Sequence, residues 1–153
     1  MDPLSVTYNG YLITTDKELM FPGDVHEWLS KVSYWAKHIP YETFMRSFNN
    51  SFCIGAILEG KQVAYGRLIT DYATYAYLAD VYVLDEHRGK GISKIMMKEL
   101  FDLEWVKGLR RIMLATKDAH ELYRKVGFKG SNFPDRLMEI TRPDIYGDMD
   151  TRC

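Results

Sequence analysis

The residues best suited to chemistry in this sequence form one short turn, made of Arg88, Gly89, Lys90 and Gly91. The two glycines let the backbone approach a ligand closely, and the two cations supply positive charge. The apolar spacing that follows predicts a helix, whose first N–H groups have no partner inside the helix and carry the positive end of its dipole. The expected ligand is therefore a phosphate or pyrophosphate. The alternative interpretation is a solvated turn that binds nothing.

Other chemical motifs are missing from the sequence. No Gly-x-x-x-x-Gly-Lys-Ser/Thr is present, so the turn is not a P-loop, and no Gly-x-Gly-x-x-Gly follows the first strand. Cys53 in an apolar run and Cys153 at the last position make neither a disulfide framework nor a zinc site. We therefore expect no metal, and we interpret Cys53 as a buried core thiol rather than a nucleophile.

Two elements must position the turn. A strand rich in aromatic and β-branched residues, predicted over Tyr75–Leu84, enters it, and an amphipathic helix over Ile92–Val106 leaves it. Arg111–Ala115 is a second predicted strand, followed by a helix over Ala119–Val126 that Asp118 caps. A helix that joins two strands in this order makes them parallel neighbours.

The sequence before these elements predicts an antiparallel arrangement. Phe52–Leu58 and Gln62–Thr70 are apolar, β-prone runs joined as a hairpin. The remaining predicted elements are a strand over Tyr11–Thr15, a helix that Asp24 caps and that contains Val25, Trp28, Leu29 and Val32, a helix over Tyr41–Phe48, and a last strand over Leu137–Thr141. The predicted fold class is therefore α/β, with a mixed sheet flanked by helices. We expect a single domain over residues 1–153, with residues 143–153 as a peripheral tail.

Composition limits the partners. Twenty Lys and Arg residues against 21 Asp and Glu give a formal net charge of −1, which leaves no electrostatic footprint for nucleic-acid binding. The longest apolar run, Phe52–Leu58, has the length of a strand and not the ~20 residues of a membrane span. The first five residues lack the pattern of a signal peptide. We therefore expect a soluble, cytoplasmic protein that binds neither nucleic acid nor membrane.

Two motifs of the sequence resemble the GNAT family of N-acetyltransferases. Arg88–Ser93 resembles the family signature Arg/Gln-x-x-Gly-x-Gly/Ala, and the preceding Asp80–Val83 resembles its Asp-x-x-Val strand. Downstream, Ala119–Phe128 resembles the second signature, Ala-x-x-Leu/Phe-Tyr-x-x-x-Gly-Phe. The resemblance implies the GNAT fold, in which the two parallel strands splay apart at the acetyl-CoA site. It also implies an acyltransferase that uses acetyl-CoA as its co-substrate.

The resemblance implies binding roles for the turn and for the strand before it. In the family the turn binds the pyrophosphate of acetyl-CoA, and backbone groups of the strand bond its pantetheine. The implied cofactor-binding residues are Val81, Tyr82, Val83, Arg88, Gly89, Lys90, Gly91, Ile92 and Ser93. Ser93 stands where the family usually has Gly or Ala, but its small hydroxyl fits a helix start and is able to donate to phosphate. His87 either faces the phosphate or is a solvated loop residue.

Tyr123 and Asp80 are the candidate catalytic residues. The resemblance implies that Tyr123 is the general acid that protonates the CoA sulfur, and the alternative is a core tyrosine on an amphipathic helix. Asp80 is the nearest carboxylate for the general base, but strand alternation places it on the face opposite Ala79. Ala79 stands where several relatives carry a Glu that acts as, or orients, the base. A structural role for Asp80, a water chain, or an amine that binds already neutral are the alternatives.

The resemblance implies a small-molecule amine or a protein amine as acceptor. Tyr34, Trp35, Lys37 and His38 lie where the family builds its acceptor wall, and core packing is the other interpretation of the aromatic residues. The predicted reaction is direct attack of the amine on the thioester, without a covalent enzyme intermediate. A non-catalytic acyl-CoA-binding sensor or interaction module on the same fold is the alternative. A homodimer is left open, because many members of the family dimerise.

Overall fold

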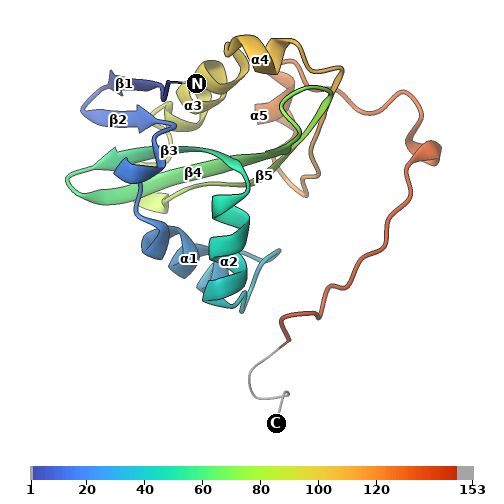
Figure 1. The fold of residues 1–153 in the computed structure, drawn as a ribbon, viewed down its shortest axis with the longest axis horizontal. Coiled ribbons are helices and arrows are strands. Elements are labelled where there is room, and N and C mark those ends of the chain that lie inside the picture. The colour runs from blue at the N-terminus through green and yellow to red at the C-terminus, as the bar shows by residue number, and fades with distance from the viewer. Residues whose placement is uncertain (1, 148–153) are drawn as a thin grey trace.

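The computed structural model describes residues 2–147, which form one six-stranded sheet between two layers of helices (Figure 1). The strands in spatial order are β1 (Ser5–Tyr8), β2 (Tyr11–Thr14), β3 (Phe52–Leu58), β4 (Lys61–Thr70), β5 (Tyr75–Val83) and β6 (Arg111–Met113). Neighbouring strands are antiparallel up to β5, whereas β6 is parallel to β5. The mixed sheet predicted from the sequence is confirmed.

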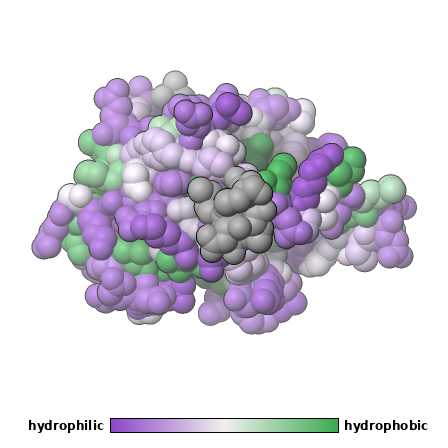
Figure 2. Space-filling view, turned by 90° about the horizontal axis from the view of Figure 1, so that it is seen from below, coloured by the Kyte–Doolittle hydropathy of each residue, from purple (hydrophilic) through white to green (hydrophobic). Residues whose placement is uncertain are grey.

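Each face of the sheet carries its own helices and its own apolar core. One face holds α1 (Pro22–Lys31) and α2 (Tyr41–Asn49), and the other holds α3 (Ile92–Phe101), α4 (Glu104–Lys107) and α5 (His120–Arg124) (Figure 1). Short 3-10 turns are η1 (Lys17–Leu19), η2 (Asp85–His87) and η3 (Pro134–Arg136). The outer surface of the α1 and α2 layer is mainly hydrophilic (Figure 2). Because helices cover both faces, the central strands β3 and β4 are buried on both sides.

Cys53 lies in the core between the sheet and helices α1 and α2, so its interpretation as a buried core thiol is confirmed. Its sulfur is 3.1 Å from the Tyr65 hydroxyl. Burial raises the pKa of the Cys53 thiol, which therefore stays protonated and unreactive at neutral pH.

Three local predictions before β6 need correction. The sequence reasoning missed β1, which joins β2 through Asn9 and Gly10, with φ angles of 48° and 87° that suit a tight hairpin. The helix predicted over Ile92–Val106 ends at Phe101 and restarts as α4. Asp24 does not cap α1, because the helix begins at Pro22; its carboxylate instead accepts the Gln62 backbone N–H at 3.1 Å.

The chain beyond β6 departs most from the predicted elements. Asp118 does not cap α5; the Thr116 hydroxyl accepts the Ala119 N–H at 3.0 Å just before the helix begins. The strand predicted over Leu137–Thr141 is wrong, since this segment is exposed and pairs with no strand among residues 2–147. Its alternating pattern suits a strand, but a strand also needs a neighbour that supplies hydrogen bonds.

The predicted tail is described only in part. Residues 143–145 are exposed, and residues 148–153 lie outside the described residues. No helix in the described part of the chain has the length and apolar character needed to cross a membrane.

Candidate active site

The two parallel strands separate to leave an open cleft. β5 and β6 pair only where Tyr75–Tyr77 lies beside Arg111–Met113, and no further pair joins these strands in the described structure. The opening is a cavity of about 470 Å³, lined by residues 77–81, residues 114–119, and Tyr34, Trp35 and Tyr123. Along the cleft, the backbone N–H and C=O groups of β5 and of the segment after β6 therefore do not pair with each other. They are able to form hydrogen bonds with an extended ligand.

A bulge in β5 shapes one wall of the cleft. The pairing register with β4 skips one residue, so that Asp80 and Val81 together face the single residue Gly66. Asp80 has a φ of 59°, an uncommon conformation for a residue with a side chain. Gly66 gives the bulge room, because a Cβ at this position would lie only 3.3 Å from Cγ2 of Val81.

The Asp80 carboxylate has two partners. Its Oδ2 accepts a hydrogen bond from Arg67 Nε at 2.7 Å, and its Oδ1 accepts one from Trp35 Nε1 at 2.8 Å. The side chains of Arg67 and Asp80 are only 16% and 11% exposed, so they form a largely buried ion pair. Both carboxylate oxygens are engaged in hydrogen bonds, and this geometry favours a structural role for Asp80. Sequence reasoning missed Arg67, which lies close to Asp80 across the antiparallel pair of β4 and β5.

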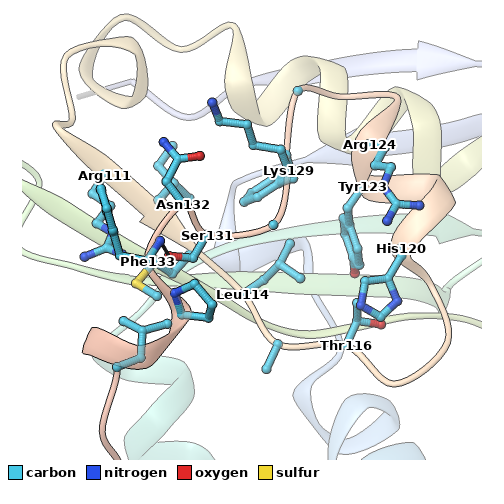
Figure 3. Close-up of a pocket in the computed structure, with 18 of the residues that line it drawn as sticks. Arg111, Leu114, Thr116, His120, Tyr123, Arg124, Lys129, Ser131, Asn132 and Phe133 are labelled. Atoms are coloured by element: carbon cyan, nitrogen blue, oxygen red, sulfur yellow. Dashed lines mark hydrogen bonds between the residues drawn. The ribbon is translucent and has the colours of Figure 1, made fainter.

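Tyr123 lies across the cleft, in α5. Its ring is buried and packs edge-on against Phe128, with the ring centroids 5.9 Å apart. Burial, followed by the charges of Asp118 and Tyr34, raises the pKa of Tyr123 to about 12. The hydroxyl is therefore protonated at neutral pH and available as a donor. Tyr123 also lines a second cavity, beyond β6, where it lies beside His120 (Figure 3). The exposed His120 side chain has no assigned role.

The turn before α3 has the geometry of an anion site. Gly89 and Gly91 have φ angles of 76° and 81°, and no side chain caps the helix that begins after Gly91. A Cβ on Gly91 would lie 2.6 Å from the Tyr8 hydroxyl, which donates a hydrogen bond to the Lys90 carbonyl. The uncapped helix start, with the exposed cations Arg88 and Lys90 beside it, therefore fits the pyrophosphate that acetyl-CoA carries.

The other predicted binding residues surround this turn. The Ser93 hydroxyl is buried in the first turn of α3 without a hydrogen-bond partner in the described structure. The Tyr82 ring stacks on Trp28 at 4.1 Å on the α1 face, so only its backbone is able to serve the cleft. His87 is partly buried, and its Nδ1 lies 2.7 Å from the Tyr11 hydroxyl. Val81, Val83 and Ile92 pack in the core under α3.

Two of the four residues predicted for the acceptor wall line the cleft. Tyr34 and Trp35 pack edge to face, with their centroids 5.0 Å apart, and the ammonium of Lys117 lies 5.2 Å from the centre of the Tyr34 ring. Lys37 and His38 are exposed and do not line the cavity. Among residues 2–147, no three His, Cys, Asp or Glu side chains are grouped to hold a metal ion.

Comparison with known proteins identifies the family of this chain. The acetyltransferase (GNAT) family model matches residues 23–128. A protein of Gibberella zeae named as an acetyltransferase is 32% identical, over 95% of this chain and 94% of its own length. A crystal structure from Xanthomonas campestris pv. campestris, described as a GNAT-family acetyltransferase, is 45% identical with a TM-score of 0.87, and the match covers 90% of this chain and 97% of that one. The thialysine N-epsilon-acetyltransferase of Bos taurus is 34% identical over 73 residues, which is 42% of this chain and 43% of that protein.

A splayed parallel strand pair beside a glycine turn and an uncapped helix start places an open cleft next to a geometry that suits a phosphate group. The family match and the relatives show that this chain belongs to the GNAT family of acetyltransferases, as its two sequence motifs indicate.

Proposed function

We propose that this chain transfers the acetyl group of acetyl-CoA directly to a primary amine, with Tyr123 as the general acid. The observation that supports this most is a buried, protonated hydroxyl at the point where β5 and β6 separate. In the reaction, a bond forms between the amine nitrogen and the acetyl carbon, and the bond from that carbon to sulfur breaks. The departing sulfur gains a proton and the attacking nitrogen loses one, so one donor and one acceptor are needed.

The residues of the turn and of β5 hold the donor in this proposal. The uncapped start of α3, with Arg88 and Lys90, binds the pyrophosphate. Backbone groups of Val81–Val83 bond the pantetheine and polarise the thioester carbonyl, a role that the lack of a strand partner on the cleft side supports. No cysteine is among the residues that line the cleft, which is consistent with direct attack.

The proposal does not assign the role of general base to Asp80. Asp80 acts as a positioning residue, because its carboxylate fixes Trp35 and the bulge through two hydrogen bonds. The amine then loses its proton to water or binds already neutral. The aromatic rings of Tyr34 and Trp35 favour an amine on an apolar stem. The bovine relative is named for acetylation of an ε-nitrogen, which supports an amine at the end of a flexible chain, from either a small molecule or a protein.

The test is the Tyr123→Phe variant, which keeps the ring and its packing on Phe128 but removes the hydroxyl. We expect kcat to fall about 10²-fold or more, the usual contribution of a general acid, with the Kd for CoA within a factor of two of wild type. Tyr41→Phe, which changes an exposed tyrosine of α2 outside the cleft, is the matched control. Unchanged turnover in Tyr123→Phe would remove Tyr123 from the mechanism.

The alternative function is an acyl-CoA-binding sensor or interaction module. One observation favours it, which is the lack of an evident general base. Ala79 stands where several relatives carry a Glu, and both carboxylate oxygens of Asp80 accept hydrogen bonds. The other carboxylate that lines the cleft belongs to the exposed Asp118. Calorimetry with acetyl-CoA and thiol release with a panel of amines separate the two functions. Binding without thiol release for any amine would support the sensor, and release with one amine would exclude it.

A further inference from the structure

One amine of the protein itself lies in the cleft. Lys117 belongs to the segment between β6 and α5, and no other lysine of the described residues lines this cavity. Its ammonium is 5.2 Å from the centre of the Tyr34 ring, within the range of a cation–π contact. Because Tyr34 follows α1, the Lys117 side chain extends from the β6 side of the cleft to its aromatic side. The fold thus places a primary amine where the acceptor is expected.

The backbone that carries Lys117 is fixed next to the proposed general acid. The Thr116 hydroxyl accepts the Ala119 N–H at 3.0 Å and closes a turn over residues 116–119. Helix α5 begins directly after this turn and carries Tyr123. Thr116, Lys117 and Tyr123 all line the cleft, and Figure 3 shows Tyr123 directed toward Thr116. An amine on this turn is therefore close to the group that would protonate the departing sulfur.

The Lys117 side chain is free to leave the Tyr34 ring. The residue is exposed, and its side chain forms no ion pair or hydrogen bond within the described part of the chain. A lysine stem of four carbons turns about several single bonds, and one exposed ring contact holds it only weakly. Lysines outside the cleft that do pair with nearby carboxylates include Lys31, Lys98 and Lys107. Lys117 therefore combines an unpaired amine with a place in the cleft.

Lys117 also has the chemistry of the proposed acceptor. That acceptor is a primary amine on a flexible apolar stem, and a lysine side chain is such an amine. A tethered amine does not have to be captured from solution, and tethering raises its effective concentration to about millimolar or above. We therefore expect Lys117 to meet the thioester of bound acetyl-CoA when no other amine occupies the cleft.

We propose that Lys117 is a self-acetylation site, which the acetyl-CoA bound to the same chain modifies when no other amine is present. The inference rests on the proposed function. A bond forms between Lys117 Nζ and the acetyl carbon, and the bond from that carbon to sulfur breaks. The sulfur gains a proton from Tyr123, which regains one from water. In sum, the Lys117 ammonium and acetyl-CoA give an acetamide, the free thiol of CoA and one proton released to water.

Acetylation of Lys117 changes the cleft. The acetamide carries no charge, so the cation–π contact with Tyr34 is lost. The modified nitrogen is no longer a nucleophile, and no second lysine of the described residues lines the cavity. Each chain is therefore expected to react once and then stop, which distinguishes self-acetylation from turnover with a free amine.

The test incubates the full chain with acetyl-CoA and no added amine, and follows thiol release together with intact mass. We expect one thiol and the mass of one acetyl group per chain, and peptide mass spectrometry should locate the acetyl group on Lys117. The half-time should stay constant over about a tenfold range of protein concentration, because the step occurs within one chain. A half-time that shortens in proportion to protein concentration would show transfer between copies and overturn the proposal.

Lys117→Arg is the test variant, because arginine keeps a cation beside Tyr34 but has no nucleophilic amine. It should lose the thiol release that the wild type shows without an added amine. Lys107→Arg is the matched control, since Lys107 is exposed in α4 outside the cleft, and it should release thiol as the wild type does. In the wild type, Lys117 should be acetylated at least about 100-fold faster than Lys107. Equal rates at the two lysines would mean uncatalysed modification and would overturn the proposal.

A panel of primary amines separates this inference from the proposed function. An amine that is acetylated should slow the acetylation of Lys117, because both occupy the same cleft. Thiol release with such an amine, together with an unmodified Lys117 in its absence, would overturn self-acetylation and leave the proposed function in place. Binding of acetyl-CoA without thiol release in either experiment would overturn both.

Discussion

The two walls of the cleft are built differently. The β5 wall lies inside the sheet, paired with β4 along most of its length, and its bulge is fixed by the buried pair of Arg67 and Asp80. The β6 wall is a strand of three residues at the sheet edge, followed by a partly exposed segment and the short helix α5. The wall that borders the glycine turn is therefore held by a neighbouring strand and a buried ion pair, whereas the wall that carries Tyr123 is supported on one side only.

The opposite edge of the sheet is formed by β1. β1 is an edge strand of four residues that exposes the polar Ser5 and Thr7 to water. β6 borders the second cavity instead, and its Ile112 packs on the same apolar core as Val6 and Tyr8 of β1. Both edge strands therefore turn an apolar face to the core, and they differ in what lies beside their outer edge.

The largest expected effect falls on the β5 wall. Arg67→Met leaves the Asp80 carboxylate largely buried without its cation, so we expect the free energy of unfolding to fall by about 3–5 kcal/mol in urea titrations. Lys31→Met is the control, because Lys31 pairs with Glu27 at the surface, with both side chains more than half exposed; its loss should be below about 1 kcal/mol. Similar losses in both variants would mean that the buried ion pair does not stabilise this wall more than a surface pair would.

The next effect concerns the turn at the end of the β5 wall. Gly91→Ala forces a left-handed residue with a side chain, at about 1–2 kcal/mol, and displaces the Tyr8 hydroxyl from the Lys90 carbonyl. We expect the Kd for CoA, measured by calorimetry, to rise about tenfold or more. Gly89→Ala is the matched variant, since its φ is similar but a Cβ there meets no atom within 4 Å. A larger loss in Gly89→Ala than in Gly91→Ala would contradict the role of the Tyr8 contact.

A smaller effect is expected at Trp35, which lines the cleft and bonds Asp80 of the β5 wall. Trp35→Phe keeps an aromatic ring but removes the hydrogen bond to Asp80. Under the proposed function, the KM for the amine should rise several-fold while the Kd for CoA stays unchanged. Trp105→Phe is the control, because the Trp105 Nε1 is buried without a partner in the described structure and lies outside the cleft. An unchanged KM in Trp35→Phe would show that Asp80 does not act through Trp35.

The smallest effect concerns the β6 wall. Asp118→Asn removes a negative charge that raises the pKa of Tyr123, so this pKa should fall below about 12 and yet remain above neutrality. Because the general acid must be protonated, the alkaline fall of kcat should move to lower pH, with turnover at pH 7 nearly unchanged. Glu121→Gln is the control: Glu121 lies in α5 with Tyr123, and this substitution should leave the pH dependence of kcat unchanged. Equal profiles for wild type and Asp118→Asn would contradict the coupling of Asp118 to Tyr123.

The strands and helices near the turn could be predicted because their signals are local. Phe52–Leu58 matches β3 residue for residue, and the turn of Gly89 and Gly91 is placed by two glycines before an apolar helix. β1 was missed, although Asn9 and Gly10 form a recognisable hairpin turn. The break between α3 and α4 was missed because the apolar spacing continues through Leu103.

The sequence by itself indicated the central strands, the glycine turn, the family and the helix that carries Tyr123, because each is encoded by residues close together in the chain. Only the tertiary structure decided the bulge at Asp80, its pairing with Arg67 and Trp35, and the fate of Leu137–Thr141. These features depend on which segments become neighbours. A strand exists only when another backbone completes its hydrogen bonds, and a carboxylate acts as a base or as an anchor according to what surrounds it.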